Sequence, residues 1–81
     1  MTEEVLETLS FKMITDGYID ILHSEYRNKE VKGKVYAYAK ILDSKGSYFV
    51  SDDYDNPQEA INDIKKQIKE YCEETHREVK F

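Results

Sequence analysis

The side chains best suited to metal binding or catalysis are Cys72, His76 and His23. Cys72 and His76 are four residues apart, so on a helix they would share one face and offer two of the four ligands of a zinc site. The chain has one cysteine, and His23 has no zinc-binding spacing to the other two residues. We therefore expect Cys72 to be a small core residue, His76 to be a cation near a helix end, and no metal to be bound.

A second candidate for chemistry is the acidic cluster Asp52, Asp53 and Asp55 around Tyr54. Such carboxylates can gather calcium, or act as acid and base where their environments separate their pKa values. The spacing lacks the glycine and glutamate of a calcium loop. Glycine-rich phosphate loops, serine elbows and paired cysteines do not occur in the sequence either. We expect the cluster to cap a helix and aid solubility, and the protein to be neither an enzyme nor cofactor-dependent.

Basic residues concentrate between residues 27 and 45. This segment contains six basic and only two acidic residues, although the whole chain has a net charge of −5. Sheet faces that bind nucleic acid combine cations with aromatic rings, which neutralise phosphates and stack on bases. The candidate nucleic-acid-binding residues are Arg27, Lys29, Lys32, Lys34 and Lys40, interleaved with Tyr36 and Tyr38. Lysines also solvate loops and deter edge pairing, and the acidic remainder disfavours a polyanion.

Seven tyrosines are many for 81 residues. Tyrosine buries a large area while its hydroxyl stays in water, so it suits surfaces that bind proteins. One helix covers only one face of a sheet, and the other face remains to display such side chains. The candidate protein-binding residues are Tyr18, Tyr36, Tyr38 and Tyr48. The expected occupant of this face is a protein partner or a second copy of the chain.

An amphipathic helix is predicted from Pro57 to about His76 or Arg77. Proline suits the first helical position, and Asp55 or Asn56 can cap the helix. Apolar residues then recur at intervals of three and four, which is typical of a helix with one packed face and one wet face.

Strand patterns precede this helix, with apolar residues alternating at a period of two. The predicted strands span residues 9–15, 18–26, 35–42 and 48–51. Asp16-Gly17 and residues 43–46 supply turn chemistry between strands, and Gly33 relieves a turn in the basic loop 28–34. Residues 35, 37, 39 and 41 should face the helix, which leaves Tyr36 and Tyr38 facing outward.

The N-terminal segment, residues 2–14, is open to two interpretations. Thr2-Glu3-Glu4 could open a helix, but that helix would leave Phe11 and Ile14 on its wrong side. The prediction is a single α+β domain, residues 1–81, with an antiparallel sheet of three to four strands packed on one long C-terminal helix. The element order is ββββα, with αβββα as the alternative.

The stretch from Val35 to Tyr71 resembles three known families. A YFVS-like strand before a helix opened by an EEA-like turn is typical of the HicB-type antitoxin core, and Tyr48-Phe49-Val50-Ser51 and Glu59-Ala60 carry that match. The hairpin-then-helix order is similar to the arm-type DNA-binding domain of phage integrases, whose strands before the helix are basic where this chain has Asp52-Asp53. In the αβββα order the chain resembles a double-stranded-RNA-binding domain.

These observations predict a non-catalytic macromolecule-binding module, a small regulator or inhibitor of a protein partner. Phage or mobile-element origin is an association at the level of the fold. Nucleic-acid binding through residues 27–45 is the alternative function. The single cysteine and the lack of a signal-peptide pattern fit the cytoplasm, and no apolar run approaches the roughly 18 residues of a membrane span.

Overall fold

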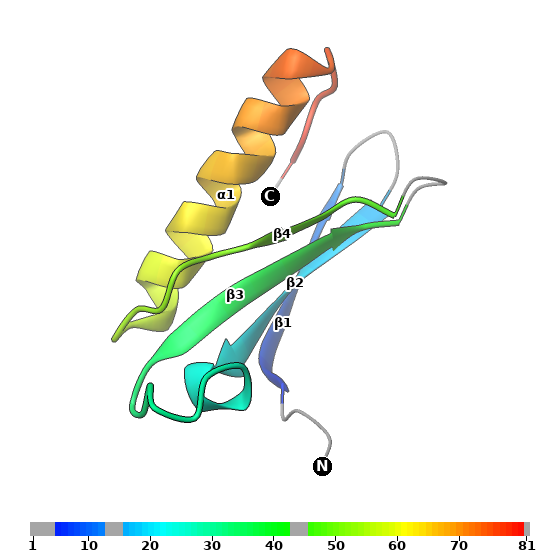
Figure 1. Ribbon diagram of the computed structural model, residues 1–81. Coiled ribbons are helices and arrows are strands. Elements are labelled where there is room, and N and C mark those ends of the chain that lie inside the picture. Colours follow the sequence, from blue (N-terminus) through cyan, green and yellow to red (C-terminus); the bar gives the residue numbers. More distant parts are fainter. Residues whose placement is uncertain (1–4, 13–15, 43–45, 81) are drawn as a thin grey trace.

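Four strands form one antiparallel sheet, and a long helix packs on one face of it (Figure 1). The computed structural model describes residues 5–12, 16–42 and 46–80. The sheet order is β1-β2-β3-β4, so each strand pairs with its neighbour in sequence. The elements are β1 (Val5–Lys12), β2 (Asp16–His23), the 3-10 turn η1 (Ser24–Tyr26), β3 (Val35–Ile41), β4 (Tyr48–Val50) and α1 (Pro57–Glu74). The predicted ββββα architecture is confirmed, and the αβββα alternative is wrong because residues 5–12 form a strand.

The hydrophobic core lies between α1 and the sheet. In the register of β2 and β3, Ile19 faces Ala39 and Ile21 faces Ala37, and all four are buried. The two alanines allow the helix to approach the centre of the sheet closely, as their predicted inward orientation implied. The buried core residues are Phe11, Ile19, Ile21, Val35, Ala37, Ala39, Ile41, Ala60, Ile61, Ile64, Ile68 and Cys72.

The hairpin between β1 and β2 forms, but Asp16 and Gly17 are not its turn. Gly17 pairs with Phe11 and Asp16 pairs with Lys12, so both residues belong to β2, and residues 13–15 lie outside the described part. The Phe11 ring lies over Gly17, where a Cβ atom would overlap the ring. Glycine is needed here because of this close approach rather than because of its backbone angles. The turn interpretation of this pair was wrong.

The end of the second strand also differs from the prediction. The predicted strand 18–26 ends at His23, because the carbonyl of Ser24 accepts hydrogen bonds from the N–H groups of Arg27 and Asn28 and closes η1. Gly33 has φ 74°, as its predicted turn role requires. The predicted turn at 43–46 falls mostly outside the described residues.

Helix α1 begins as predicted, with Asn56 as its cap. The Asn56 side chain accepts a hydrogen bond of 2.7 Å from the N–H of Gln58, and Pro57 occupies the first turn. These contacts satisfy one of the otherwise unpaired N–H groups at the helix start and need no hydrogen from the proline.

The helix ends at Glu74, about two residues before the predicted end. His76 adopts φ 55°, in the left-handed region, so the N–H of Arg77 reaches back to the carbonyl of Cys72 at 2.8 Å. The N–H of His76 donates to the carbonyl of Glu73. This pair of bonds is a Schellman motif, with histidine at the position that glycine usually takes.

His76→Gly is therefore expected to raise the free energy of unfolding by about 0.5–1 kcal/mol, because glycine removes the steric cost of the left-handed conformation. Urea denaturation followed by circular dichroism measures the change. Thr75→Gly is the control: Thr75 has φ −100°, so the same substitution one position earlier should destabilise the protein. A destabilised His76→Gly variant would show that the histidine side chain itself contributes more than the strain costs.

Candidate functional site

The face of the sheet that points away from α1 carries three cross-strand rows. The register sets the first row as Ser10, Tyr18, Lys40 and Tyr48, and the second as Thr8, Asp20, Tyr38 and Val50. The third row contains Val5, Leu22 and Tyr36. We call the surface formed by these eleven residues the tyrosine face.

Large apolar side chains are exposed on the tyrosine face. Tyr48 is 64% exposed, Val5 44% and Val50 37%. The Tyr38 and Tyr48 rings stack with their centroids 5.8 Å apart and an interplanar angle of 22°. Burial is the largest cause that raises the pKa of the Tyr38 phenol, and the nearby Tyr18, Tyr48 and Asp20 raise it further. This phenol therefore stays neutral and able to donate a hydrogen bond at physiological pH.

A hollow of about 470 Å³ lies within the second and third rows. Its floor is apolar, since Leu22 is only 4% exposed and Tyr36 only 5%. The Arg27 guanidinium covers the Tyr36 ring at 4.0 Å from the centroid. The hollow is lined by Val5, Asp20, Leu22, Arg27, Tyr36, Tyr38 and Val50. An apolar floor with one acid and one base at the rim suits a large side chain of a partner.

The four candidate protein-binding tyrosines all belong to the tyrosine face, but they differ in accessibility. Tyr48 is exposed, Tyr18 and Tyr38 are half-buried, and Tyr36 is covered by Arg27. Sequence reasoning missed Val5, because a register shift between Val5 and Glu7 turns Val5 onto this face against the simple alternation. Binding by any of these residues stays a prediction.

The five candidate nucleic-acid-binding residues occupy different settings. Arg27 Nη2 donates to the carboxylate of Asp53 at 2.7 Å and to the carbonyl of Ser51 at 3.0 Å. Lys34 pairs with Asp55 at 3.2 Å. Lys29 and Lys32 are exposed in the loop between η1 and β3, and Lys40 lies in the first row of the tyrosine face. Acidic residues of the cluster before α1 thus neutralise two of the five.

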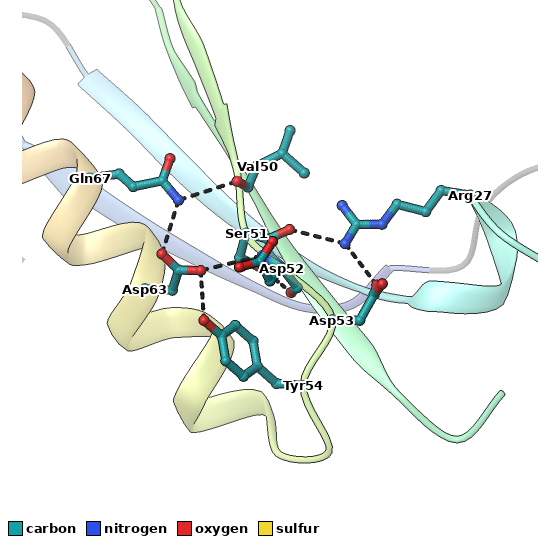
Figure 2. A network of polar contacts seen from close by, with 9 residues as sticks. Arg27, Val50, Ser51, Asp52, Asp53, Tyr54, Asp63 and Gln67 are labelled. Carbon is teal, nitrogen blue, oxygen red and sulfur yellow. Dashed lines mark hydrogen bonds and ion pairs between the residues drawn. The ribbon is translucent and has the colours of Figure 1, made fainter. Parts of the chain in front are cut away.

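A network of polar contacts joins α1 to the segment after β4, and Figure 2 shows Asp63 at its centre. Asp63 Oδ2 accepts from the Tyr54 hydroxyl at 2.8 Å and from the N–H of Asp52 at 3.3 Å. Asp63 Oδ1 accepts from Gln67 Nε2 at 3.0 Å, and the same nitrogen donates to the carbonyl of Val50 at 3.2 Å. We call Asp63, Gln67 and Tyr54, with the backbone of Val50 and Asp52, the polar clamp.

The polar clamp shifts the pKa values of two of its members. Burial opposes ionisation of Asp63, but the hydrogen bonds from Gln67, Tyr54 and the backbone of Asp52 outweigh it and lower the pKa of the carboxyl group. The hydrogen bond to Asp63 raises the pKa of the Tyr54 phenol. Each group is thereby held in its ordinary charge state at neutral pH, which suits a structural role rather than proton transfer.

The chain between β4 and α1 bulges where the polar clamp holds it. Val50 faces Tyr38 and Tyr54 bridges Val35, so three residues on one side oppose two on the other. The Ser51 hydroxyl accepts from the N–H of Ala37 at 2.7 Å and donates to the carbonyl of Asp52 at 2.9 Å. The bulge directs the acidic cluster away from the sheet and toward Arg27, Lys34 and the helix.

Comparison with known proteins gives no family. No family model, curated protein or solved structure matches the chain. The resemblances noted in the sequence remain predictions.

Cys72 and His76, the remaining candidates for metal binding or catalysis, occupy different environments. Cys72 is buried in the core, where burial raises the pKa of its thiol against the opposing effect of Arg77, and His76 is exposed beyond the end of α1. Among the residues described, no three His, Cys, Asp or Glu side chains lie close enough together to hold a metal ion. In the same part of the chain, no helix has both the length and the apolar character to cross a membrane.

Proposed function

We propose that the protein is a non-catalytic binding module, a small regulator or inhibitor that contacts a protein partner through the tyrosine face. The observation that carries the proposal is the exposure of Tyr48, Val5 and Val50 together on the face opposite α1. Exposed apolar side chains gathered around a hollow are typical of protein-binding surfaces, and tyrosine is enriched among residues that dominate binding energy.

The electrostatics of the molecule support a protein rather than a nucleic acid as the partner. The chain has a net charge of −5, and Arg27 and Lys34 of the basic segment are paired with Asp53 and Asp55. Binding to phosphates would have to compete with those carboxylates. The carboxylate of the polar clamp is occupied by three hydrogen bonds, which supports a role other than catalysis.

A pull-down from the native host lysate tests the proposal, with and without nuclease and at two salt concentrations. The tagged wild-type chain is expected to recover a protein at fixed stoichiometry after nuclease treatment. Tyr48→Ala should weaken that capture by about 10- to 100-fold, the range for an interface tyrosine that dominates binding.

Lys66→Ala is the matched control, because Lys66 is exposed on α1 and away from the tyrosine face. It should leave the capture unchanged. If the Tyr48→Ala variant captures the partner as well as the wild type does, the proposal is overturned. Recovery of nucleic acid that disappears at high salt would instead support the basic segment, and Lys29→Ala with Lys32→Ala should then reduce the salt dependence.

A further inference from the structure

The tyrosine face contains both a protruding side chain and a hollow. Tyr48 in the first row is the most exposed large apolar side chain of the described residues. The hollow begins one row away, at Val50 and Tyr38. Residues two apart on a strand are separated by roughly 6.6 Å, so protrusion and hollow are immediate neighbours.

This arrangement is self-complementary under a two-fold axis. The axis lies between two apposed tyrosine faces. It runs across the strands, between the first and second rows, and so reverses the order of the rows. The first row of each copy then lies over the second row of the other, which forms one side of the hollow, so Tyr48 packs beside Val50 and Tyr38 of the second copy. An isologous contact of this kind uses each residue twice and closes after two copies.

The charges on the tyrosine face follow the same symmetry. Its eleven residues include one acid, Asp20 in the second row, and one base, Lys40 in the first row. The two-fold axis that places Tyr48 in the hollow also places Lys40 beside Asp20 of the second copy. Two copies that each carry −5 repel overall, but the two charged residues among these eleven have opposite signs, and Arg27 at the rim of the hollow is already paired with Asp53.

We infer that the tyrosine face binds a second copy of the chain, with Tyr48 in the hollow of its partner and two Lys40–Asp20 ion pairs across the interface. The inference rests on the proposed function, since it names an occupant for the same face. We expect a small contact of this kind to be weak and the dimer to dissociate in the micromolar range, since interfaces below about 1,200 Å² are typical of transient complexes.

Two charge reversals and their mixture test this inference. Sedimentation equilibrium from about 10 μM to about 1 mM should show a monomer–dimer equilibrium for the wild type, a range set by the expected affinity. Lys40→Glu places two acids in each contact, and Asp20→Lys places two bases there. Each variant alone should weaken dimerisation by at least about 10-fold.

An equimolar mixture of Lys40→Glu and Asp20→Lys should dimerise as well as the wild type. In that heterodimer the two substituted side chains, one now acidic and the other now basic, meet in one contact, and the unchanged Asp20 and Lys40 meet in the other. An effect within a single chain cannot be repaired by mixing, so recovery in the mixture identifies the contact as intermolecular. Tyr48→Ala provides an independent variant at an exposed side chain and should weaken dimerisation without a change of charge.

Three outcomes would overturn the inference. The first is a wild type that stays monomeric at the highest concentration, and the second is a dimer that none of the three variants weakens. The third is a mixture that stays monomeric although both single variants have lost dimerisation. In each case the proposed function survives if Tyr48→Ala still weakens the capture of another protein, so the two failures are distinguishable.

Discussion

Replacing Phe11 with alanine is expected to lower the free energy of unfolding by about 3–5 kcal/mol. Phe11 is 3% exposed, belongs to the core and covers Gly17 on the neighbouring strand. Its removal leaves a cavity that Gly17, with no side chain, cannot fill. Urea denaturation followed by circular dichroism measures the loss, and thermal unfolding should show a midpoint lower by more than about 10 °C.

The partner substitution Gly17→Ala should also destabilise the protein, by about 1–3 kcal/mol, because the new methyl group overlaps the Phe11 ring. This sign is the reverse of the usual one, since glycine inside a strand normally costs about 0.5–1 kcal/mol relative to alanine. In a Phe11→Leu background the cost of Gly17→Ala should fall by at least about 1 kcal/mol. Additive effects of the two substitutions would refute direct packing of the ring on Gly17.

Asp63→Ala is expected to lower the free energy of unfolding by about 2 kcal/mol, because it removes the acceptor of three of the four hydrogen bonds in the polar clamp. The cost is not larger because the site is partly exposed, and solvent weakens charged hydrogen bonds there. Asp63→Asn is the control that keeps the size and removes the charge, and it should fall between the wild type and alanine. A wild-type stability in Asp63→Ala would show that the clamp contributes nothing measurable.

The clamp also predicts a pH dependence. The pKa of Asp63 is lowered on folding, so its contribution is present above the unfolded value of about 4 and is lost as the pH falls through the folded pKa. The pKa of Tyr54 is raised on folding, so its contribution is lost as the pH rises beyond about 10. Urea denaturation across pH should show both losses in the wild type. Asp63→Asn should flatten both limbs, and equal slopes in the two proteins would contradict this account.

Local signals in the sequence were sufficient for the start of α1 and for the inward face of β3. Asn56 and Pro57 act through contacts within one helical turn, and Ala37 and Ala39 follow a two-residue period that no distant contact changes. The end of α1 was harder to predict because His76 takes a left-handed conformation that histidine adopts less often than glycine. The turn prediction for Asp16-Gly17 was wrong because glycine also occurs where a side chain of a neighbouring strand packs closely on the backbone.

The tyrosine face was predictable only in part, because local patterns show which face a residue lies on but not its distant contacts. Alternation places Tyr36 and Tyr38 on the face away from the helix, but it does not show that Arg27, nine residues earlier, covers one of them. The polar clamp joins positions that carry ordinary surface residues, Asp63 and Gln67, to the segment after β4. Such contacts depend on where the helix lies over the sheet, which no short segment of sequence encodes.

The polar clamp also affects the addition of further strands at the β4 edge of the sheet. Gln67 occupies the carbonyl of Val50 and Asp63 occupies the N–H of Asp52, so helix side chains bind two backbone groups at the end of β4 and just after it. A fibre built by strand addition needs two open edges on every molecule, one to receive a strand and one to present the next. A strand that added to the end of β4 would have to displace both of these contacts. The polar clamp therefore opposes open-ended polymerisation at this edge, although β4 has neither a charged residue nor a proline.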